Sequence, residues 1–314
     1  MNQILRIFSP LVKREVSATS KVSRCVYLIL VPGYLNSKFT ITRNLKVETL
    51  SLLFAPPTKS GRMEIYMINN KKFPVLEIKD LTKQIGSKVI VNHLNLSLEQ
   101  GDIYGFLGPN GAGKTTTLRM ITRLVFPTSG EIFIRGNSVS RNHKKAISCV
   151  GNIIENPAFY LNMTASQNLE LSAKLSAKEI TTSRLDEVLE IVHLSDVKDD
   201  KVKNFSLGMK QRLGFANSLL CHPALVILDE PTNGVDPMGL VEMKELIKRL
   251  AEQEKITFLI SSHMLREMQD LCNRVAIIQK GTLMETGEVN ELLEKYKVGN
   301  LEDLFFTCVK QFGK

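Results

Sequence analysis

The sequence predicts an α/β fold, with a mostly parallel core sheet, a small antiparallel β subdomain and an inserted α-helical subdomain. Residues 225–228 and 256–260 are continuously apolar, which is typical of parallel strands buried on both faces. Residues 156–220, just before them, show helical periodicity instead. Near the start of the regular pattern, two strand-like segments flank the turn residues Gly86-Ser87, which favours an antiparallel pair.

The remaining elements follow in chain order. Strands are expected at residues 75–81, 89–98, 103–107, 131–135 and 146–154, and a helix is expected at about 113–124. Within the helical insertion, at about 156–220, hydroxyl side chains that can accept from free backbone N–H groups mark three candidate N-caps: Thr164, Ser183 and Ser206. The last predicted helix has an apolar face made by Met209, Leu213, Ala216 and Leu220.

Composition and charge limit the possible functions. The chain has 314 residues, of which 43% are hydrophobic, and this is ample for a packed core. Residues 1–74 hold 12 of the 41 Lys and Arg but 3 of the 32 Asp and Glu, which leaves 29 of each sign in the rest. The net charge of +9 therefore belongs to the N-terminal segment, and it does not predict a nucleic-acid partner for the folded part.

Residues 1–74 are predicted to be a basic, poorly ordered N-terminal extension. Two interpretations stay open: a basic arm that touches anionic lipid or a partner, or a stretch upstream of a natural start at Met63 or Met67. An apolar patch at residues 25–35 is broken by Pro32 and Gly33 and is too short to span a membrane. Residues 291–314 are expected to form a C-terminal tail.

The five cysteines are widely spaced and form no C-x-x-C pair. Their odd number and spacing predict neither a disulfide framework nor a zinc cluster. A reducing cytosol is the expected environment.

A phosphate-binding motif follows the strand at 103–107. It reads Gly108-Pro109-Asn110-Gly111-Ala112-Gly113-Lys114-Thr115, which is the G-x-x-x-x-G-K-[ST] loop between a strand and a helix. Successive backbone N–H groups and the helix N-terminus favour bound phosphate. We expect Lys114 to reach the β- and γ-phosphates, Thr115 to ligate Mg²⁺ and Thr116 to add a donor near the α-phosphate. The core is therefore predicted to be a P-loop NTPase (RecA-like) core that binds ATP.

Two carboxylates end the apolar run at 225–228. Asp229 is placed to hold Mg²⁺, through water, and Glu230 to polarise the water that attacks the γ-phosphate. Taken alone, such a pair is more often just a solvated turn, but the phosphate-binding motif upstream reverses that preference, because ligands bind at the carboxyl ends of parallel strands. His263 ends the next buried strand, and we expect it to contact the γ-phosphate and position the water.

A second phosphate-binding feature is predicted at Ser206 and Gly208. A serine N-cap and a glycine in the first turn leave a helix N-terminus open to an anion, although a plain capped amphipathic helix has the same pattern. A loop with Asn233, Asp236 and Pro237 follows Glu230.

This order of motifs over residues 75–290 resembles the ATP-binding cassette (ABC) transporter ATPases. The resemblance implies an ATPase domain at 75–290 and a head-to-tail homodimer, in which Ser206 and Gly208 of one copy close over ATP held by the other. It also implies that Asp236 communicates across that interface.

Three positions depart from the family pattern. The signature reads Phe205-Ser206-Leu207-Gly208-Met209, without the first glycine and the glutamine. Glu155 stands where the family places a glutamine that senses the metal and couples to the membrane subunit, so metal affinity or coupling can differ. Ile85 stands where an aromatic residue stacks on adenine, which keeps dispersion contact but loses the π-face.

These departures resemble the bacitracin and lantibiotic self-protection branch. The resemblance implies an ATP-hydrolysing subunit, cytoplasmic and peripheral on the inner face of the membrane, that powers export through a separate permease. That permease is expected to dock near residues 155–160, where Phe159 and Tyr160 either contact it or belong to the local core. The alternatives are a non-transport ATPase of translation or DNA repair, and a binding-only regulatory cassette.

Overall fold

The computed structural model describes residues 73–155, 157–176, 179–232 and 236–312, together with the backbone of a few strands within residues 1–72. The chain divides into two units, Met1–Lys72 and Phe73–Lys314. All the predicted site residues belong to the second unit, which we call the cassette.

The first unit contains one antiparallel sheet in the order β1-β4-β3-β2. Its strands are β1 (Leu5–Ile7), β2 (Lys38–Arg43), β3 (Lys46–Phe54) and β4 (Met63–Ile68). No periodic pattern in the sequence predicted them. The apolar patch at 25–35 lies outside the described residues, and both interpretations of residues 1–74 stay predictions.

The core of the cassette is a six-stranded sheet in the order β10-β11-β12-β7-β13-β14. Its strands are β7 (Ile103–Leu107), β10 (Val150–Ile153), β11 (Leu225–Asp229), β12 (Thr257–Ser262), β13 (Arg274–Gln279) and β14 (Thr282–Glu288). All neighbours are parallel except β13 and β14. The phosphate loop follows β7 and the two carboxylates end β11, so β12 lies between the strands that carry them.

Alternate residues of the buried strands enter two separate hydrophobic clusters. Leu228 and Ile260 belong to the cluster that contains α5 (Leu207–Leu219) and α6 (Pro237–Gln253). Ile227 and Leu259 belong to the other, which contains α1 (Lys114–Ile121) and the antiparallel strands. The sheet is thus covered on both faces, which explains why its strands read as continuous apolar runs.

The predicted antiparallel β subdomain is confirmed. It is a four-stranded sheet in the order β6-β5-β8-β9. The strands are β5 (Leu76–Ile85), β6 (Lys88–Leu98), β8 (Ser129–Ile134) and β9 (Asn137–Ser138).

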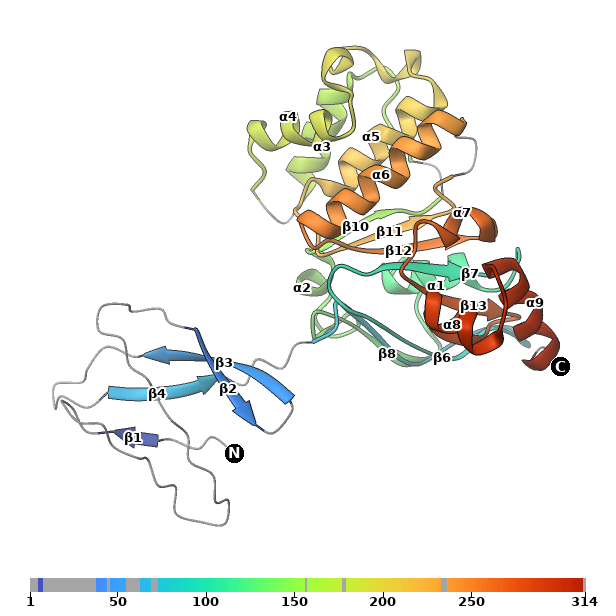
Figure 1. Ribbon diagram of the computed structural model, residues 1–314. Helices are drawn as coiled ribbons and strands as arrows, with labels where there is room; N and C mark the ends of the chain where they lie inside the picture. Colours follow the sequence, from blue (N-terminus) through green and yellow to red (C-terminus); the bar gives the residue numbers. More distant parts are fainter. Residues whose placement is uncertain are drawn as a thin grey trace. The chain divides into compact units, whose positions relative to one another are not determined.

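The inserted helical subdomain is also confirmed. It contains α3 (Ala165–Leu175), α4 (Thr182–Ile191), the 3-10 turns η1 (Ser195–Val197) and η2 (Val202–Asn204), and α5. In Figure 1, α5 and α6 run side by side above β10, β11 and β12, with α3 and α4 beyond α5. Helix α5 therefore joins the subdomain to the core.

Two local predictions in this region need correction. The N-cap of α4 is Thr181 and not Ser183, because the Thr181 hydroxyl accepts from the backbone N–H of Arg184. The predicted strand at 146–154 is shorter, because residues His143–Ile147 form helix α2 and bury Ala146. The N-caps Thr164 and Ser206 are confirmed, the first as a capping box with Gln167.

The C-terminal part is helical. Helix α7 (Leu265–Gln269) follows β12, and α8 (Val289–Tyr296) and α9 (Leu301–Phe312) follow β14, on the side where Figure 1 marks the C-terminus. The sequence predicted only a tail here. Among the helices of the described residues, none has the length and apolar character needed to cross a bilayer.

Candidate nucleotide site

The phosphate loop is shaped by glycines that no larger residue can replace without strain. Gly111 and Gly113 have φ of 79° and 102°, in the left-handed region. A Cβ on Gly108 would lie 2.2 Å from the Ile278 carbonyl oxygen, and one on Gly113 would lie 2.7 Å from that of Ile90. The loop can therefore curl tightly against β13 and β6, which is the conformation that turns backbone N–H groups toward one point.

Lys114 is buried at the first position of α1, with 5% of its surface exposed. Its ammonium donates to the carbonyl oxygen of Gly108 at 2.7 Å and lies 3.2 Å from Glu230 Oε1. Thr115 and Thr116, in the same helical turn, are half-buried. The structure thus brings the loop lysine of β7-α1 and the carboxylate after β11 together.

Asp229 and Glu230 lie at the carboxyl end of β11, as predicted. Asp229 is 7% exposed, and its Oδ1 accepts from the Ser261 hydroxyl. Glu230 has φ of 49°. Its carboxylate is shared between Lys114, through Oε1, and His263, whose Nδ1 lies 2.8 Å from Oε2.

His263 follows β12 and is 39% exposed on its side chain. Besides the ring contact, its backbone N–H donates to Glu230 Oε2 at 3.4 Å. Lys114, Glu230 and His263 therefore form one continuous polar chain from the phosphate loop to the end of β12. This arrangement has the donors, the carboxylate and the histidine that phosphoryl transfer to water requires.

Ser206 and Gly208 begin helix α5. The Ser206 hydroxyl accepts from the Met209 N–H at 3.2 Å, so the cap leaves other first-turn N–H groups of α5 without an intrahelical partner. A Cβ on Gly208 would meet nothing closer than Ser206 Oγ at 4.0 Å. A larger side chain at position 208 would therefore clash with no described residue, and the backbone conformation does not require glycine.

Asp236 is the N-cap of α6, and its Oδ1 accepts from the Gly239 N–H at 2.9 Å. That hydrogen bond lowers the pKa of the Asp236 carboxyl. The rest of the predicted loop, residues 233–235, lies outside the described residues.

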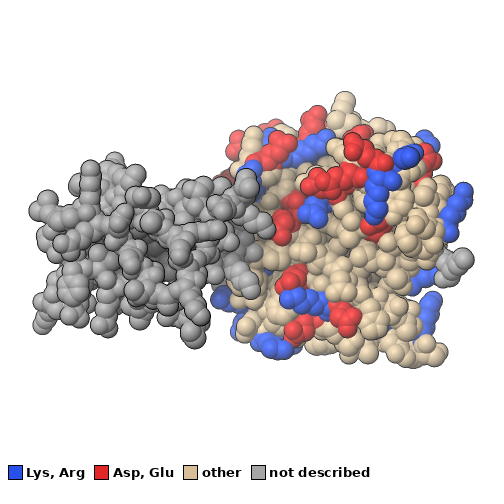
Figure 2. Space-filling model, turned by 60° about the horizontal axis from the view of Figure 1, so that its bottom comes forward, with Lys and Arg blue, Asp and Glu red and all other residues tan. Residues whose placement is uncertain are grey.

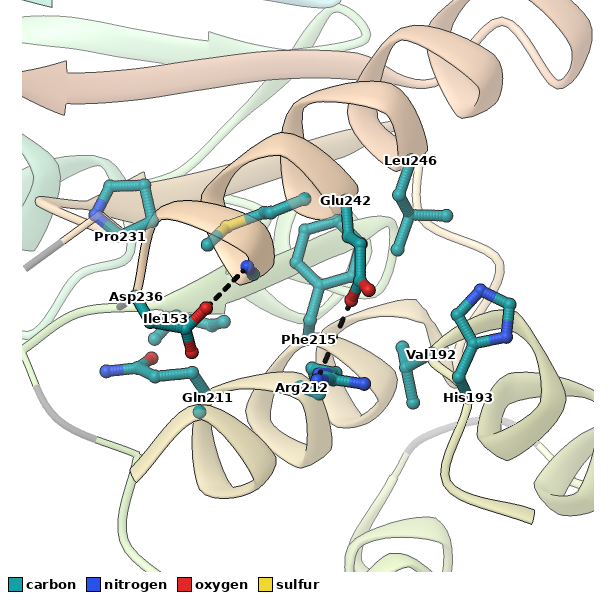
Figure 3. A pocket seen from close by; sticks show the side chains of 13 residues that line it. Ile153, Val192, His193, Gln211, Arg212, Phe215, Pro231, Asp236, Glu242 and Leu246 are labelled. Carbon is teal, nitrogen blue, oxygen red and sulfur yellow. Dashed lines mark hydrogen bonds and ion pairs between the residues drawn. The ribbon is translucent and has the colours of Figure 1, made fainter. Parts of the chain in front are cut away.

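A pocket between α5 and α6 is visible in Figure 3. Its walls include Ile153, Phe215 and Leu246, and its rim carries Asp236 and the ion pair of Arg212 on α5 with Glu242 on α6, at 3.6 Å. No residue of the phosphate loop lines it. The pocket therefore lies between α5 and α6, where Gly208 also lines it, and not at the phosphate loop.

Glu155 follows β10 in a left-handed conformation, with φ of 64°. It forms an ion pair with Arg119 on α1, and both side chains are partly exposed. Sequence reasoning missed Arg119, although its position five residues after Lys114 places it on the helix that follows the loop. The predicted role of Glu155 at the metal stays a prediction.

The remaining predicted contacts lie at the surface. Ile85, at the end of β5, is 60% exposed, and its role at the adenine stays a prediction. Tyr160 is 64% exposed, whereas Phe159 packs on the core. Only Tyr160 of these two aromatic residues presents a large open surface.

The fold and this site define a nucleotide-binding α/β protein with the parts of an ATPase. Residues 91–233 match the family described as ABC transporter. Bacitracin transport ATP-binding protein BcrA of Bacillus licheniformis is 51% identical over 211 residues, 67% of this chain and 69% of that protein. Lantibiotic transport ATP-binding protein SrtF of Streptococcus pyogenes is 40% identical over 233 residues, 74% of this chain and 96% of that protein.

The fold comparison agrees. A solved structure titled as the ATP binding subunit of an ABC transporter matches with a TM-score of 0.68 and 24% identity, over 75% of this chain and 99% of that one. The chain belongs to the ABC transporter family, as an ATP-binding and ATP-hydrolysing subunit. The predicted resemblance to the bacitracin and lantibiotic branch is confirmed.

Proposed function

We propose that this chain powers the export of bacitracin- or lantibiotic-like peptides through a separate permease, and so protects the cell that makes or meets them. The observation that carries the proposal is 51% identity to a bacitracin transport protein, together with a lysine, a carboxylate and a histidine joined in one site. The names of these relatives favour transport over translation, DNA repair or a binding-only role.

In the proposed chemistry, each residue of the polar chain has one task. Lys114 binds the β- and γ-phosphates, Glu230 takes a proton from the attacking water, and His263 holds that water and the γ-phosphate in line. The existing contact of Glu230 with both Lys114 and His263 supports this division. The phosphate-binding loop is made by Gly108, Pro109, Asn110, Gly111, Ala112 and Gly113. Ile85 contacts the adenine ring of ATP.

Mg²⁺ is proposed to be held by the Thr115 hydroxyl, by Asp229 through water and by the phosphates. Both protein groups offer hard oxygen ligands, which suit this ion. No cluster of three or more His, Cys, Asp or Glu that could hold a metal occurs in the described part of the chain.

Two copies are proposed to close head to tail over two nucleotides. Gly208 has no side chain, and no described neighbour requires glycine at this position. This supports the proposal that a phosphate of the nucleotide held by a second copy approaches the N-terminus of α5. Ser206 adds a hydroxyl there, and Asp236 communicates across the interface.

The permease is proposed to dock beside Glu155 and the exposed Tyr160, which places the cassette on the inner face of the membrane. Nucleic acid is not a proposed partner. The face of the cassette in Figure 2 carries basic and acidic side chains interspersed around a broad uncharged area, and residues 75–314 hold 29 of each sign.

The test is a deletion strain complemented with the wild-type gene or with Glu230→Gln. We expect the variant protein to bind ATP but to lose turnover by at least about 100-fold and to accumulate as a nucleotide-bound dimer, because the base is removed and binding is not. Bacitracin and lantibiotic susceptibility should return to that of the deletion strain. Size-exclusion chromatography, ATPase rate and minimal inhibitory concentration measure the three results.

The control is Glu190→Gln, which changes an exposed carboxylate on α4, in the helical subdomain and outside the site. It should behave as wild type. An unchanged hydrolysis rate in Glu230→Gln would remove that residue as the base, and unchanged susceptibility in the deletion strain would remove the peptide-export proposal.

A further inference from the structure

Ser261 lies between the two acidic residues and the phosphate-loop strand, and the proposed chemistry assigns it no task. It lies on β12 and is fully buried. In the parallel sheet it is in register with Asp229 on one side and with Phe106, two residues before Gly108, on the other. It is therefore placed between the strand of the carboxylates and the strand of the phosphate loop.

The Ser261 hydroxyl makes two hydrogen bonds of opposite direction. It donates to Asp229 Oδ1 at 2.5 Å and accepts from the backbone N–H of Glu230 at 3.1 Å. Among the described residues, Asp229 Oδ2 has no such partner. A donor fixed on one carboxylate oxygen sets the rotation of the carboxylate and leaves the other oxygen for a metal-bound water.

The second hydrogen bond acts on Glu230. The N–H of Glu230 is shared by the hydroxyl and the carbonyl oxygen of Ser261, both at 3.1 Å. Glu230 has φ of 49°, a conformation that non-glycine residues rarely adopt and that needs support from its surroundings. That backbone turn directs the carboxylate to Lys114 and His263.

We propose that Ser261 is a positioning residue that orients both acidic groups with one hydroxyl: Asp229 toward the metal and Glu230 toward the attacking water. The inference rests on the proposed roles of Asp229 and Glu230. Ser262, the next residue, does not duplicate it, because its hydroxyl accepts from the Met264 N–H and its carbonyl oxygen from the Gly108 N–H.

The test compares Ser261→Ala with Ser261→Thr in the full-length protein. We expect Ser261→Ala to lower kcat by about tenfold or more, because the variant loses one hydrogen bond to a charged group. Its apparent affinity for Mg²⁺ should also fall by about tenfold. ATP binding without metal should stay within about twofold of wild type, because the phosphate loop is intact. Ser261→Thr keeps the hydroxyl and should retain much of the wild-type kcat and of the apparent affinity for Mg²⁺.

A readout independent of turnover is the binding of Mn²⁺ together with a non-hydrolysable ATP analogue, followed by electron paramagnetic resonance. Ser261→Ala should weaken Mn²⁺ binding by about tenfold, as it does the apparent affinity for Mg²⁺. Ser138→Ala is the matched control, since Ser138 is also a buried serine, but its hydroxyl contacts Ser140 beside β9. It should change neither metal binding nor kcat.

The outcomes separate the inference from the function on which it rests. If Ser261→Ala matches wild type in kcat and Mn²⁺ binding while Glu230→Gln is inactive, the positioning role is wrong and the proposed function stands. If Glu230→Gln itself hydrolyses ATP normally, the proposed function fails first. Should Ser261→Ala not fold, Ser261→Cys replaces it, and equal metal affinity of the Cys and Thr variants would overturn the inference.

Discussion

At the scale of single residues, Glu155, which we predict to stand at a glutamine position of the family, has an ion-pair partner on the helix of the phosphate loop. Arg119 and Glu155 join α1 to the segment after β10. Their side chains are 38% and 60% exposed, so water screens the pair. It can hold the two segments together without contributing much to stability.

We therefore predict that Glu155→Gln lowers the free energy of unfolding by less than about 1 kcal/mol but changes the stimulation of ATP hydrolysis by the permease. Urea unfolding and ATPase assays with and without the permease measure the two effects. Glu131→Gln is the control, because it breaks the exposed pair with Arg141 at another place. Normal stimulation in Glu155→Gln would show that the carboxylate has no part in coupling.

At the scale of elements, helix α5 carries Ser206 and Gly208 at one end and packs closely on β10 near the other. A Cβ on Gly151 of β10 would lie 1.9 Å from the Ser218 carbonyl oxygen, and one on Gly214 would lie 2.9 Å from Pro157. Pro157, two residues after Glu155, therefore lies close against α5 and connects the Glu155 segment to this helix.

Two glycine substitutions should behave in opposite ways. We predict that Gly151→Ala lowers stability by about 1–3 kcal/mol, since backbone must shift to admit the methyl group. Gly208→Ala should keep or raise stability by up to about 1 kcal/mol, because alanine favours helix and no described atom opposes it, yet it should abolish cooperative ATP hydrolysis. Thermal unfolding and ATPase rates distinguish them. A fully active Gly208→Ala would contradict the closing of a second copy over α5.

The sequence could predict the elements whose signal is local. Thr164 and Ser206 act as caps through neighbours three residues away, and the loop at Gly108 is fixed by its own glycines. Ser183 failed because Thr181 offered an equivalent hydroxyl two residues earlier. Ser261 was missed because its partners, Asp229 and Glu230, become neighbours only when β11 and β12 pair in register.

At the scale of the whole molecule, the cassette contains every predicted site residue, and the unit Met1–Lys72 contains none. We predict that a chain beginning at Phe73 folds and hydrolyses ATP within about twofold of the full-length rate. Circular dichroism and ATPase assays check this. A loss of folding would show that the first unit supports the cassette.

The natural start of the chain is tested separately by mass mapping of N-terminal peptides in the native host. A peptide from residues 1–60 would exclude a start at Met63 or Met67. Full-length protein remains the control in both experiments.

The central place of β12 restricts where this protein can change its length. A slip of one residue in β12 would turn the Ser261 side chain to the opposite face of the sheet and offset its register with both Asp229 on β11 and Phe106 on β7. Insertions and deletions within residues 257–262 are therefore incompatible with catalysis, whatever their effect on stability.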